Sequence, residues 1–510
     1  MKSIYEYFAT VLSENKNKVA VDDCKENITF GELNEIAGKV GTAIINICDS
    51  QMNCPVLVYM PKSCQAISVF LGVVFSGNFY VPLDMKQPDL RIQRIKNVMG
   101  AKCIITLQEY KEKLLELGFE KEEILTYEDV LELGHANLEL IKTIQERVID
   151  TDPLYVKFTS GSSGEPKGVV LSHRAVIDYI IYFKKIIGMD NTQVSGCISP
   201  LHFDNSVHDV YGMFCCGSTL ILMPEKCMMF PAELIEVINE KNINVLWWPT
   251  TAIVLLATSR ILEKKVINHN IDLVTNAGEV LQVKYYNQIL PYFQNTKFYN
   301  IYGPTETAVT SSVYLIDRKF DDNESFPIGK PFPNTDIFLL TEDKKKVADI
   351  DAIGEICIRG SSLAGGYYNN AEKTGQAFVQ NPLNPYYPEL IYLTGDLGKY
   401  NAEGELLFIG RKDFQIKHKG ARIELGEIEA AASGVEMVNE CCVIYNQEEE
   451  KIVLFYSAEN EIPKKNLLSG MLKQIPKNML PEEVYYYEQL PKNANGKIDR
   501  VKLKADYFSK

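Results

Sequence analysis

The chain has 510 residues and a mass of 57.7 kDa, a length that suggests about three or four structural units. A hydrophobic fraction of 46% and a charged fraction of 24% are typical of globular proteins and exclude a disordered, fibrous or membrane-spanning chain. The net charge is −14 and no block of Lys and Arg stands out, so no nucleic-acid partner is expected.

Neither a membrane partner nor a secretory route is expected. The N-terminus has no apolar signal region, and the most apolar stretch, residues 71–83, is too short to span a bilayer. The twelve cysteines include no CxxC pair and are accompanied by few histidines, which argues against a zinc site or a disulfide framework. We therefore expect buried free thiols and a cytoplasmic location.

Short apolar runs alternate with longer amphipathic stretches through the first 400 residues. Strands are expected at 56–60, 103–106, 219–223 and 245–248, and helices at 66–75, 109–117 and 232–239. This βαβ rhythm predicts α/β layers with largely parallel sheets.

The pattern changes to strands and turns from about residue 328. Antiparallel strands are expected at 337–340 and 354–359. After a second boundary near residue 413, the pattern predicts a strand at 414–417, a tight turn at 419–420, a helix opening near 426–429, and strands at 443–445 and 452–456. We therefore predict a large domain, 1–412, and a small α+β domain, 413–510.

The most concentrated chemical signal is the loop Thr-Ser-Gly-Ser-Ser-Gly-Glu-Pro-Lys-Gly at residues 159–168, between apolar strands at 154–158 and 169–171. Consecutive N–H groups and hydroxyls in such a loop can wrap phosphate oxygens, and Lys167 adds a cation. It is not a Walker A loop, because Pro166 and Gly168 stand where that motif needs Gly and Ser or Thr. A plain flexible turn is the alternative.

Two later turns also carry polar groups at strand ends. Residues 300–307, Asn-Ile-Tyr-Gly-Pro-Thr-Glu-Thr, offer Tyr302 to stack on a base and Glu306 to hold Mg²⁺. Residues 392–397 end a strand with Asp396, a usual partner of ribose hydroxyls. Taken alone, either segment could be an ordinary capped turn.

Two segments near the C-terminus suggest moving parts. Residues 410–427 supply polar and Gly positions that can absorb backbone rotation at the expected boundary, although a solvated loop is the alternative. Residues 495–496, Asn-Gly, predict a tight turn that presents Lys497 at its tip. A lone lysine near a C-terminus is usually only a solvated charge.

In this order and spacing, the motifs resemble the adenylate-forming (AMP-binding) superfamily, specifically the amino-acid adenylation domains of non-ribosomal peptide synthetases and their stand-alone relatives, including D-alanine–carrier-protein ligases. The resemblance runs from residues 28–33, Ile-Thr-Phe-Gly-Glu-Leu, through 81–84, Val-Pro-Leu-Asp, to Lys497. Ser163 and the pair His418-Lys419 depart from the usual pattern without removing a group that the chemistry needs.

The resemblance implies a large N-terminal domain of two layered α/β subdomains plus a small β-barrel-like subdomain, followed by a small mobile α+β domain. It implies that ATP and Mg²⁺ are used to join a carboxylic acid to AMP with release of pyrophosphate, after which a phosphopantetheine thiol takes the acyl group. Both partners of the first step are anionic, so positioned cations and N–H groups are needed rather than a general base.

By the same resemblance, each site residue receives a role. The phosphates would be held by Thr159, Ser160, Gly161, Ser162, Ser163, Gly164 and Lys167. The adenine and ribose would be held by Gly278, Glu279, Asn300, Tyr302, Gly303, Asp396 and Arg411. Glu306 would hold Mg²⁺, Lys497 would be the main electrostatic catalyst, Asp413 would be the hinge, and Gly420 would line the thiol tunnel.

The expected substrate depends on residues 202–206, His-Phe-Asp-Asn-Ser, which match the family's Phe-Asp-x-Ser segment. Its Asp pairs with the substrate α-ammonium in the family, so Asp204 favours an α-amino acid, although a helix-capping Asp fits the spacing too. The other pocket positions would be Asn205, His208, Leu246, Thr275, Ala277, Ile301, Val309 and Thr310.

That lining is mostly apolar and has no counter-charge, which favours a neutral substrate side chain of small to medium size. His208 fits either a pocket donor or a packed helix histidine. Ala277 stands where D-alanine ligases carry Cys, which counts against D-alanine without excluding it.

We therefore expect an ATP-dependent amino acid ligase, acting as a cytoplasmic monomer. The chain ends at Lys510 without a carrier-like module, so the phosphopantetheinylated carrier protein would act in trans. An acyl- or aryl-CoA ligase of the same superfamily is one alternative, against which Asp204 counts. A non-catalytic nucleotide-binding relative is another, against which the retained charged site residues count.

Overall fold

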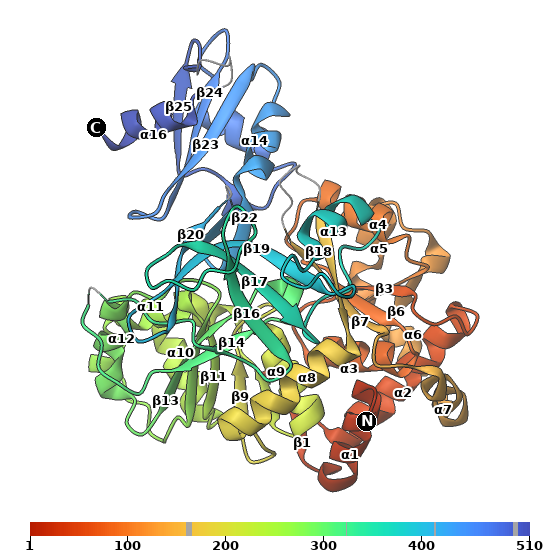
Figure 1. The fold of residues 1–510 in the computed structure, drawn as a ribbon. Helices are drawn as coiled ribbons and strands as arrows, with labels where there is room; N and C mark the ends of the chain where they lie inside the picture. Colours follow the sequence, from red (N-terminus) through yellow and green to blue (C-terminus); the bar gives the residue numbers. More distant parts are fainter. Residues whose placement is uncertain (160–165, 323, 413–414, 493–497, 510) are drawn as a thin grey trace. The chain divides into compact units, whose positions relative to one another are not determined.

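The computed structural model describes residues 1–159, 166–322, 324–412, 415–492 and 498–509 (Figure 1). The chain divides into two compact units. The first contains residues 1–85, 99–157 and 168–412, and the second contains residues 86–98, 158–167 and 413–510. Among the described residues, no helix combines the length and apolar character needed to cross a membrane.

A nine-stranded sheet forms one layer of the first unit, in the order β15-β14-β13-β12-β11-β9-β10-β1-β2. Its strands are β1 (Val19–Asp22), β2 (Asn27–Thr29), β9 (Val194–Cys197), β10 (Thr219–Leu222), β11 (Val245–Pro249), β12 (Leu273–Ala277), β13 (Lys297–Tyr302), β14 (Ser312–Leu315) and β15 (Lys330–Pro331). The central strands pair in parallel, and the pairs at both edges are antiparallel. The parallel centre confirms the sheet type predicted from the βαβ rhythm.

A second sheet has the order β6-β5-β3-β4-β7-β8. Its strands are β3 (Pro55–Tyr59), β4 (Phe79–Pro82), β5 (Cys103–Thr106), β6 (Ile124–Thr126), β7 (Pro153–Thr159) and β8 (Lys167–Ser172). The strand predicted at 103–106 has the observed bounds, whereas the helix predicted at 109–117 begins as a 3-10 turn, Gln108–Tyr110.

Helices pack around these two sheets (Figure 1). They are α1 (Ile4–Asn15), α2 (Phe30–Ile47), α3 (Cys64–Phe75), α5 (Lys111–Glu116), α6 (Tyr127–Glu132), α7 (Leu138–Arg147), α8 (His173–Phe183), α9 (Ser206–Cys216), α10 (Pro231–Glu240), α11 (Thr250–Ser259) and α12 (Val283–Ile289). Helix α4 (Asp89–Met99) belongs almost wholly to the second unit. Helix α9 is almost wholly buried, so the segment that precedes it is fixed by the core.

Two hydrophobic clusters lie on opposite faces of the nine-stranded sheet, and strand β11 contributes to both. Val245 and Trp247 belong to one cluster, and Leu246 and Trp248 belong to the other. Successive side chains of a strand point to opposite faces, so neighbouring residues on β11 meet different surroundings.

A five-stranded antiparallel sheet completes the first unit, as the change to strands and turns predicted. It contains β16 (Thr335–Leu340), β17 (Gly354–Gly360), β18 (Phe378–Gln380), β19 (Leu390–Tyr400) and β20 (Leu406–Arg411). Its order is β16-β17-β19-β18, with β20 also pairing with β19, and α13 (Ala371–Ala377) precedes β18.

The second unit mixes helices and strands. It contains β21 (Gln415–His418), β22 (Ala421–Glu424), α14 (Leu425–Ser433), β23 (Glu440–Asn446), β24 (Lys451–Ser457), α15 (Lys464–Met471), β25 (Glu483–Tyr487) and α16 (Arg500–Phe508). Lys419 and Gly420 join β21 to β22 with positive φ angles of 51° and 80°, which confirms the predicted tight turn. The predicted hinge residue Asp413 lies outside the described residues.

Candidate active site

Three residues assigned to the nucleotide, Tyr302, Asp396 and Arg411, lie together in the first unit. Asp396 on β19 and Arg411 on β20 are opposite one another in an antiparallel pair and form an ion pair. The Tyr302 hydroxyl, at the end of β13, donates to the other Asp396 oxygen at 2.6 Å. Burial and the Asp396 charge raise the pKa of Tyr302 well above its usual value, so its hydroxyl stays a donor. The arrangement fixes a buried carboxylate, and carboxylate oxygens have further lone pairs for hydroxyl donors.

Glu306, assigned to Mg²⁺, lies just beyond β13 in a short 3-10 helix, Thr305–Thr307. The residue is 1% exposed, and the Tyr367 hydroxyl donates to its Oε1 at 2.8 Å. Mg²⁺ usually takes one or two carboxylates together with substrate phosphates. A buried carboxylate held by a neutral tyrosine fits that donor set.

Asp204 lies two residues before α9 and does not cap it. The N-cap residue is Asn205, whose side chain makes no capping hydrogen bond, and the Asp204 carboxylate instead accepts from the Thr305 hydroxyl. The helix-capping alternative is therefore wrong. Asp204 is partly exposed, as a group that meets a substrate must be.

His208, in the first turn of α9, is buried among aromatic rings. Its ring stacks on Trp247 with centroids 5.0 Å apart, and its Nδ1 is hydrogen-bonded to the Tyr179 hydroxyl. Its Nε2 lies 3.5 Å from Oγ1 of Thr310, another predicted pocket residue. Burial and, secondly, the cation of Lys157 lower the pKa of His208 to about 3. The imidazole is therefore neutral at physiological pH.

Leu246 does not join this group, because it packs in the cluster on the opposite face of the sheet. Its neighbour Trp247 stacks on His208, and its carbonyl accepts a hydrogen bond from Asn205 at 3.0 Å. The assignment of Leu246 to the pocket is corrected to Trp247. The two residues are neighbours on β11, and a shift of one residue along a strand exchanges its two faces.

Most remaining pocket positions share the face of Trp247. Thr275 on β12 lies opposite Trp247 in the sheet, and Ala277, Ile301 and Val309 belong to the same hydrophobic cluster as Trp247. Trp247 and Thr310 contact His208 directly, and the other positions belong to the hydrophobic cluster or the strand register of Trp247, apart from Leu246.

The loop after β13 is closely packed against itself. A Cβ on Gly303 would lie 2.4 Å from the Val309 carbonyl oxygen and 2.6 Å from the Thr310 Cα, so only glycine fits. Ala308 and Val309 both have positive φ angles, 53° and 73°. Such a backbone is unusual for a β-branched residue and costs on the order of 1–3 kcal/mol.

Three more residues are assigned to the adenine and ribose, namely Asn300, Gly278 and Glu279. The Asn300 amide accepts from Asn276 and donates to the Pro327 carbonyl, both at 2.8 Å, in a buried network. Gly278 is exposed with a φ of 93°, and the Glu279 carbonyl accepts from Thr250 at 2.9 Å. These hydrogen bonds hold the ends of β12 and β13 in place.

The phosphate loop is described only at its ends. Thr159 ends β7, and Lys167 begins β8 and pairs with Glu424, of the same unit, at 3.6 Å. The predicted residues between them, Ser160, Gly161, Ser162, Ser163 and Gly164, lie outside the described residues, as does Lys497. Gly420 lies at the β21–β22 turn.

The sequence-based assignment does not include Lys157, which lies within the predicted apolar strand at 154–158. Its side chain is buried, with the residue 3% exposed, and Nζ donates to the Phe203 carbonyl at 2.6 Å and to the Ser206 hydroxyl at 3.0 Å. A buried cation thus contacts the segment that carries Asp204 and His208, which the expectation of a lining without a counter-charge did not include. A charge within an otherwise apolar strand was the signal that could have revealed it.

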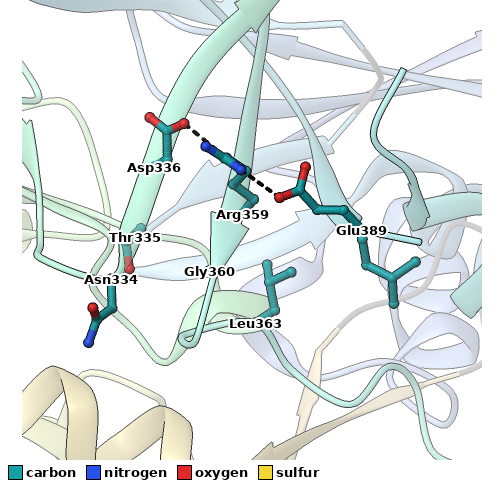
Figure 2. Close-up of a pocket in the computed structure, with 8 residues that line it drawn as sticks. Asn334, Thr335, Asp336, Arg359, Gly360, Leu363 and Glu389 are labelled. Atoms are coloured by element: carbon teal, nitrogen blue, oxygen red, sulfur yellow. Dashed lines mark hydrogen bonds and ion pairs between the residues drawn. The ribbon is translucent and has the colours of Figure 1, made fainter. Parts of the chain in front are cut away.

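A pocket of about 620 Å³ lies elsewhere in the first unit (Figure 2). It is lined by Asn334, Thr335, Asp336, Arg359, Gly360, Leu363, Glu389 and Leu390, none of them a predicted site residue. Arg359 lies between two carboxylates, with Nε 3.0 Å from Asp336 and Nη1 2.5 Å from Glu389.

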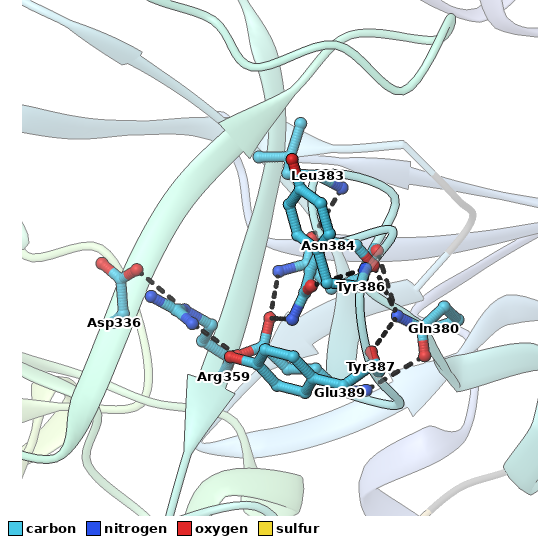
Figure 3. A network of polar contacts seen from close by, with 9 residues as sticks. Asp336, Arg359, Gln380, Leu383, Asn384, Tyr386, Tyr387 and Glu389 are labelled. Carbon is cyan, nitrogen blue, oxygen red and sulfur yellow. Dashed lines mark hydrogen bonds and ion pairs between the residues drawn. The ribbon is translucent and has the colours of Figure 1, made fainter.

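The same Glu389 also binds the loop before it, as Figure 3 shows. Its carboxylate accepts from Asn381 at 2.6 Å, and its backbone N–H donates to Gln380 at 3.0 Å. Arg359 is therefore neutralised by groups that fasten residues 380–389 to the sheet, and we interpret this network as structural.

The family follows from comparison with known proteins. The AMP-binding enzyme model matches residues 8–368, and the AMP-binding enzyme C-terminal domain model matches residues 427–497. The chain therefore belongs to the AMP-binding enzyme family, the adenylate-forming superfamily, whose members use ATP.

The relatives are adenylation proteins of non-ribosomal peptide synthesis. The chain is 30% identical to zwittermicin A synthase ZmaJ of Bacillus cereus, over 98% of this chain and 94% of that protein. It is 29% identical to tyrocidine synthase 1 of Brevibacillus parabrevis over 98% of this chain, and it spans 45% of that protein's length. The chain thus spans about half or less of the longer synthetases that it resembles.

A solved structure shares the fold. The Vibrio cholerae adenylation domain AlmE, in complex with glycyl-adenosine-5'-phosphate, superposes with a TM-score of 0.84 and 22% identity, covering 100% of this chain and 98% of that one.

Proposed function

We propose that this protein activates an α-amino acid as its aminoacyl-adenylate and then transfers the aminoacyl group to the phosphopantetheine thiol of a carrier protein acting in trans. The proposal that the substrate is an α-amino acid depends on Asp204. Its carboxylate is partly exposed, accepts from Thr305, and lies just before helix α9, whose first turn carries the buried His208. An α-ammonium group is the complement of such a carboxylate.

The first reaction is an in-line displacement. A substrate carboxylate oxygen attacks the α-phosphorus of ATP, the bond from that phosphorus to the bridging oxygen breaks, and pyrophosphate leaves. Negative charges must be brought together, so the protein acts mainly through positioned cations and donors. Lys167 and Lys497 supply the cations in this proposal, and Asp396 with Arg411 holds the ribose.

Mg²⁺, when bound, screens the phosphate charges. Glu306 is the residue that would hold it, because it offers a buried carboxylate whose position Tyr367 fixes. Tyr302 orients the Asp396 carboxylate through its hydroxyl.

The second reaction forms a thioester. The phosphopantetheine thiol loses its proton, its sulfur attacks the acyl carbon of the adenylate, and AMP leaves with the electrons of the acyl–oxygen bond. We propose that rotation about Asp413 brings Gly420 to the thiol tunnel for this step. The tight turn at Lys419 and Gly420 supports that role, because it puts backbone rather than a large side chain at position 420.

Substrate-dependent ATP–pyrophosphate exchange tests the proposal, with a panel of L- and D-amino acids, aryl acids and fatty acids. Exchange with one or a few amino acids is the expected result. Exchange only with acids that lack an α-amine would overturn the role of Asp204 and favour a CoA ligase. Silence across the panel with ATP binding intact would favour a non-catalytic nucleotide-binding protein.

The acceptor needs a separate measurement. Transfer of radiolabelled amino acid to a purified phosphopantetheinylated carrier, with the unmodified carrier as control, tests thioester formation in trans. Transfer to coenzyme A in preference to any carrier would contradict this part of the proposal.

A further inference from the structure

Lys157 carries a buried positive charge that the roles given above do not use. It lies near the end of β7, is 3% exposed, and its Nζ lies 5.4 Å from the centroid of the Tyr155 ring. Its two hydrogen bonds, to the Phe203 carbonyl and the Ser206 hydroxyl, go to uncharged oxygens. Among the described residues, no carboxylate lies within 4.0 Å of the Lys157 ammonium.

This position is unfavourable for a cation in two ways. Burial without an ion pair is costly, and burial lowers the pKa of Lys157 to about 7. Ser206 is also the first residue of α9, an eleven-residue helix, and the N-terminal end of a helix favours an anion. The fold therefore keeps a cation where its own stability would favour an uncharged residue, which is typical of functional sites.

Lys157 contacts the segment that carries the predicted pocket residues, because its Nζ binds the carbonyl of Phe203, next to Asp204, and the hydroxyl of Ser206, two residues before His208. Asp204 lies near enough for its charge to oppose the lowering of the Lys157 pKa, and the Lys157 charge in turn lowers the pKa of His208. Asp204 and Lys157 do not form an ion pair with one another. Neither charge is therefore neutralised by the other.

The face of the sheet that carries Trp247 also contains polar atoms that have no hydrogen-bond partner within the described part of the chain. They are Oδ1 of Asn205, Nε1 of Trp247 and Oγ1 of Thr275, all buried. Buried polar groups are normally hydrogen-bonded, so unpaired atoms on this face suit a polar ligand better than an apolar one.

We propose that Lys157 binds a carboxylate on the substrate side chain, so that the substrate is an acidic α-amino acid. This inference depends on the proposed function. The substrate ammonium pairs with Asp204 and its side-chain carboxylate pairs with Lys157, so both protein charges are compensated. A neutral amino acid leaves Lys157 uncompensated, and a dicarboxylic acid without an α-amine leaves Asp204 uncompensated.

The test compares each acidic amino acid with its amide in pyrophosphate exchange. Aspartate and asparagine, and glutamate and glutamine, are measured as both enantiomers, with succinate and glutarate as acids that lack the amine. We expect the acid of one pair to exceed its amide in kcat/KM by at least about 30-fold, the lower range for a buried charge pair. Lys157→Met should abolish that preference by lowering exchange with the acid.

Lys62→Met is the matched control. Lys62 is another lysine that donates to two backbone carbonyls, those of Cys197 and Ile198, both at 3.2 Å, and burial lowers its pKa too. This variant should leave the ratio of acid to amide unchanged. An equal change in the two variants would mean that any buried lysine affects the pocket, and it would overturn the assignment to Lys157.

Binding of non-reacting sulfamoyl-adenosine analogues separates this inference from catalysis. Calorimetry with the aspartyl, asparaginyl, glutamyl and glutaminyl analogues should show the same acid preference in the wild type and its loss in Lys157→Met. Tighter binding of an acidic analogue than of its amide, in a protein that shows no pyrophosphate exchange, would contradict the proposed function and support the Lys157 site. Preference for an amide, or an acid preference that survives Lys157→Met, would overturn the Lys157 site, as would equal exchange with succinate or glutarate.

Discussion

Replacing Lys157 with methionine should stabilise the first unit, and most strongly at low pH. Methionine keeps the length of the side chain and removes its charge. The lysine pKa falls from its ordinary 10.5 to about 7 in the fold. That gap corresponds to about 5 kcal/mol of free energy, at roughly 1.4 kcal/mol per pKa unit.

The pH at which this cost applies follows from proton binding in the two states. Between about pH 7 and pH 10.5 the unfolded chain retains the Lys157 proton and the folded chain has lost it, so wild-type stability rises with pH. Below about pH 7 both states hold the proton and the whole cost is present. The stabilisation by Lys157→Met should therefore be about 3 kcal/mol larger at pH 6 than at pH 9.

Lost hydrogen bonds reduce the net gain without changing its pH dependence. Methionine removes the Lys157 donor from the Ser206 hydroxyl, whereas the Phe203 carbonyl still accepts from that hydroxyl at 2.7 Å. Leaving one buried acceptor without a donor costs about 1–3 kcal/mol, so the net stabilisation at pH 6 should be about 2–4 kcal/mol.

Urea unfolding followed by tryptophan fluorescence is a suitable assay. The chain has two tryptophans, Trp247 and Trp248, and both lie on β11 of the first unit, so the signal reports that unit. Lys142→Met, at an exposed position on α7, is the control and should behave alike at both pH values. A Lys157→Met effect that is equal at pH 6 and pH 9, or destabilisation at pH 6, would refute the reasoning.

Four further outcomes are expected at the proposed site. Asp204→Asn should lower pyrophosphate exchange by about 100-fold or more, because an amide does not compensate a buried ammonium. ATP binding measured by calorimetry should stay unchanged. A parallel loss of ATP binding would contradict the role of Asp204. Because the pKa of His208 is lowered to about 3, stability should fall as pH drops from about 6.5 towards 3. The rate profile of His208→Gln should keep the same pH dependence as the wild type between pH 5 and 8; a limb near pH 6.5 present only in the wild type would show that the imidazole titrates. Lys497→Ala should slow adenylate formation by orders of magnitude and leave thiol transfer from preformed adenylate largely intact, whereas equal losses in both steps would rule out its role as electrostatic catalyst.

Sequence patterns predicted the elements of the fold well, because apolar periodicity reports which face of an element is buried. The strand at 103–106 and the helix at 232–239 match β5 and α10 within two residues. The meeting of Asp396 with Arg411 was expected only through the family resemblance, because residues on two strands give no local signal of their pairing. The network around Arg359 was not expected at all, for the same reason.

The amino acid pocket was less predictable. Leu246 and Trp247 are neighbours and both apolar, so composition could not decide which faces His208, and only the alternation of β11 settles it. The role of Lys157 is not predictable from the sequence, because the residues around it in the strand at 154–158 are mostly apolar. A single charge among such neighbours gives no indication of burial, which depends on how β7 packs against the start of α9.

The crowding at Gly303 affects how the pocket could be redesigned. The loop after β13 follows a path set by backbone contacts, since a side chain at 303 would collide with the main chain at 309 and 310. These contacts are made by backbone atoms, so side-chain changes at Val309 and Thr310 leave them in place. A library for new substrates should vary these two positions and keep glycine at 303. Asparagine or glycine at 309 would also relieve the left-handed backbone that valine now adopts.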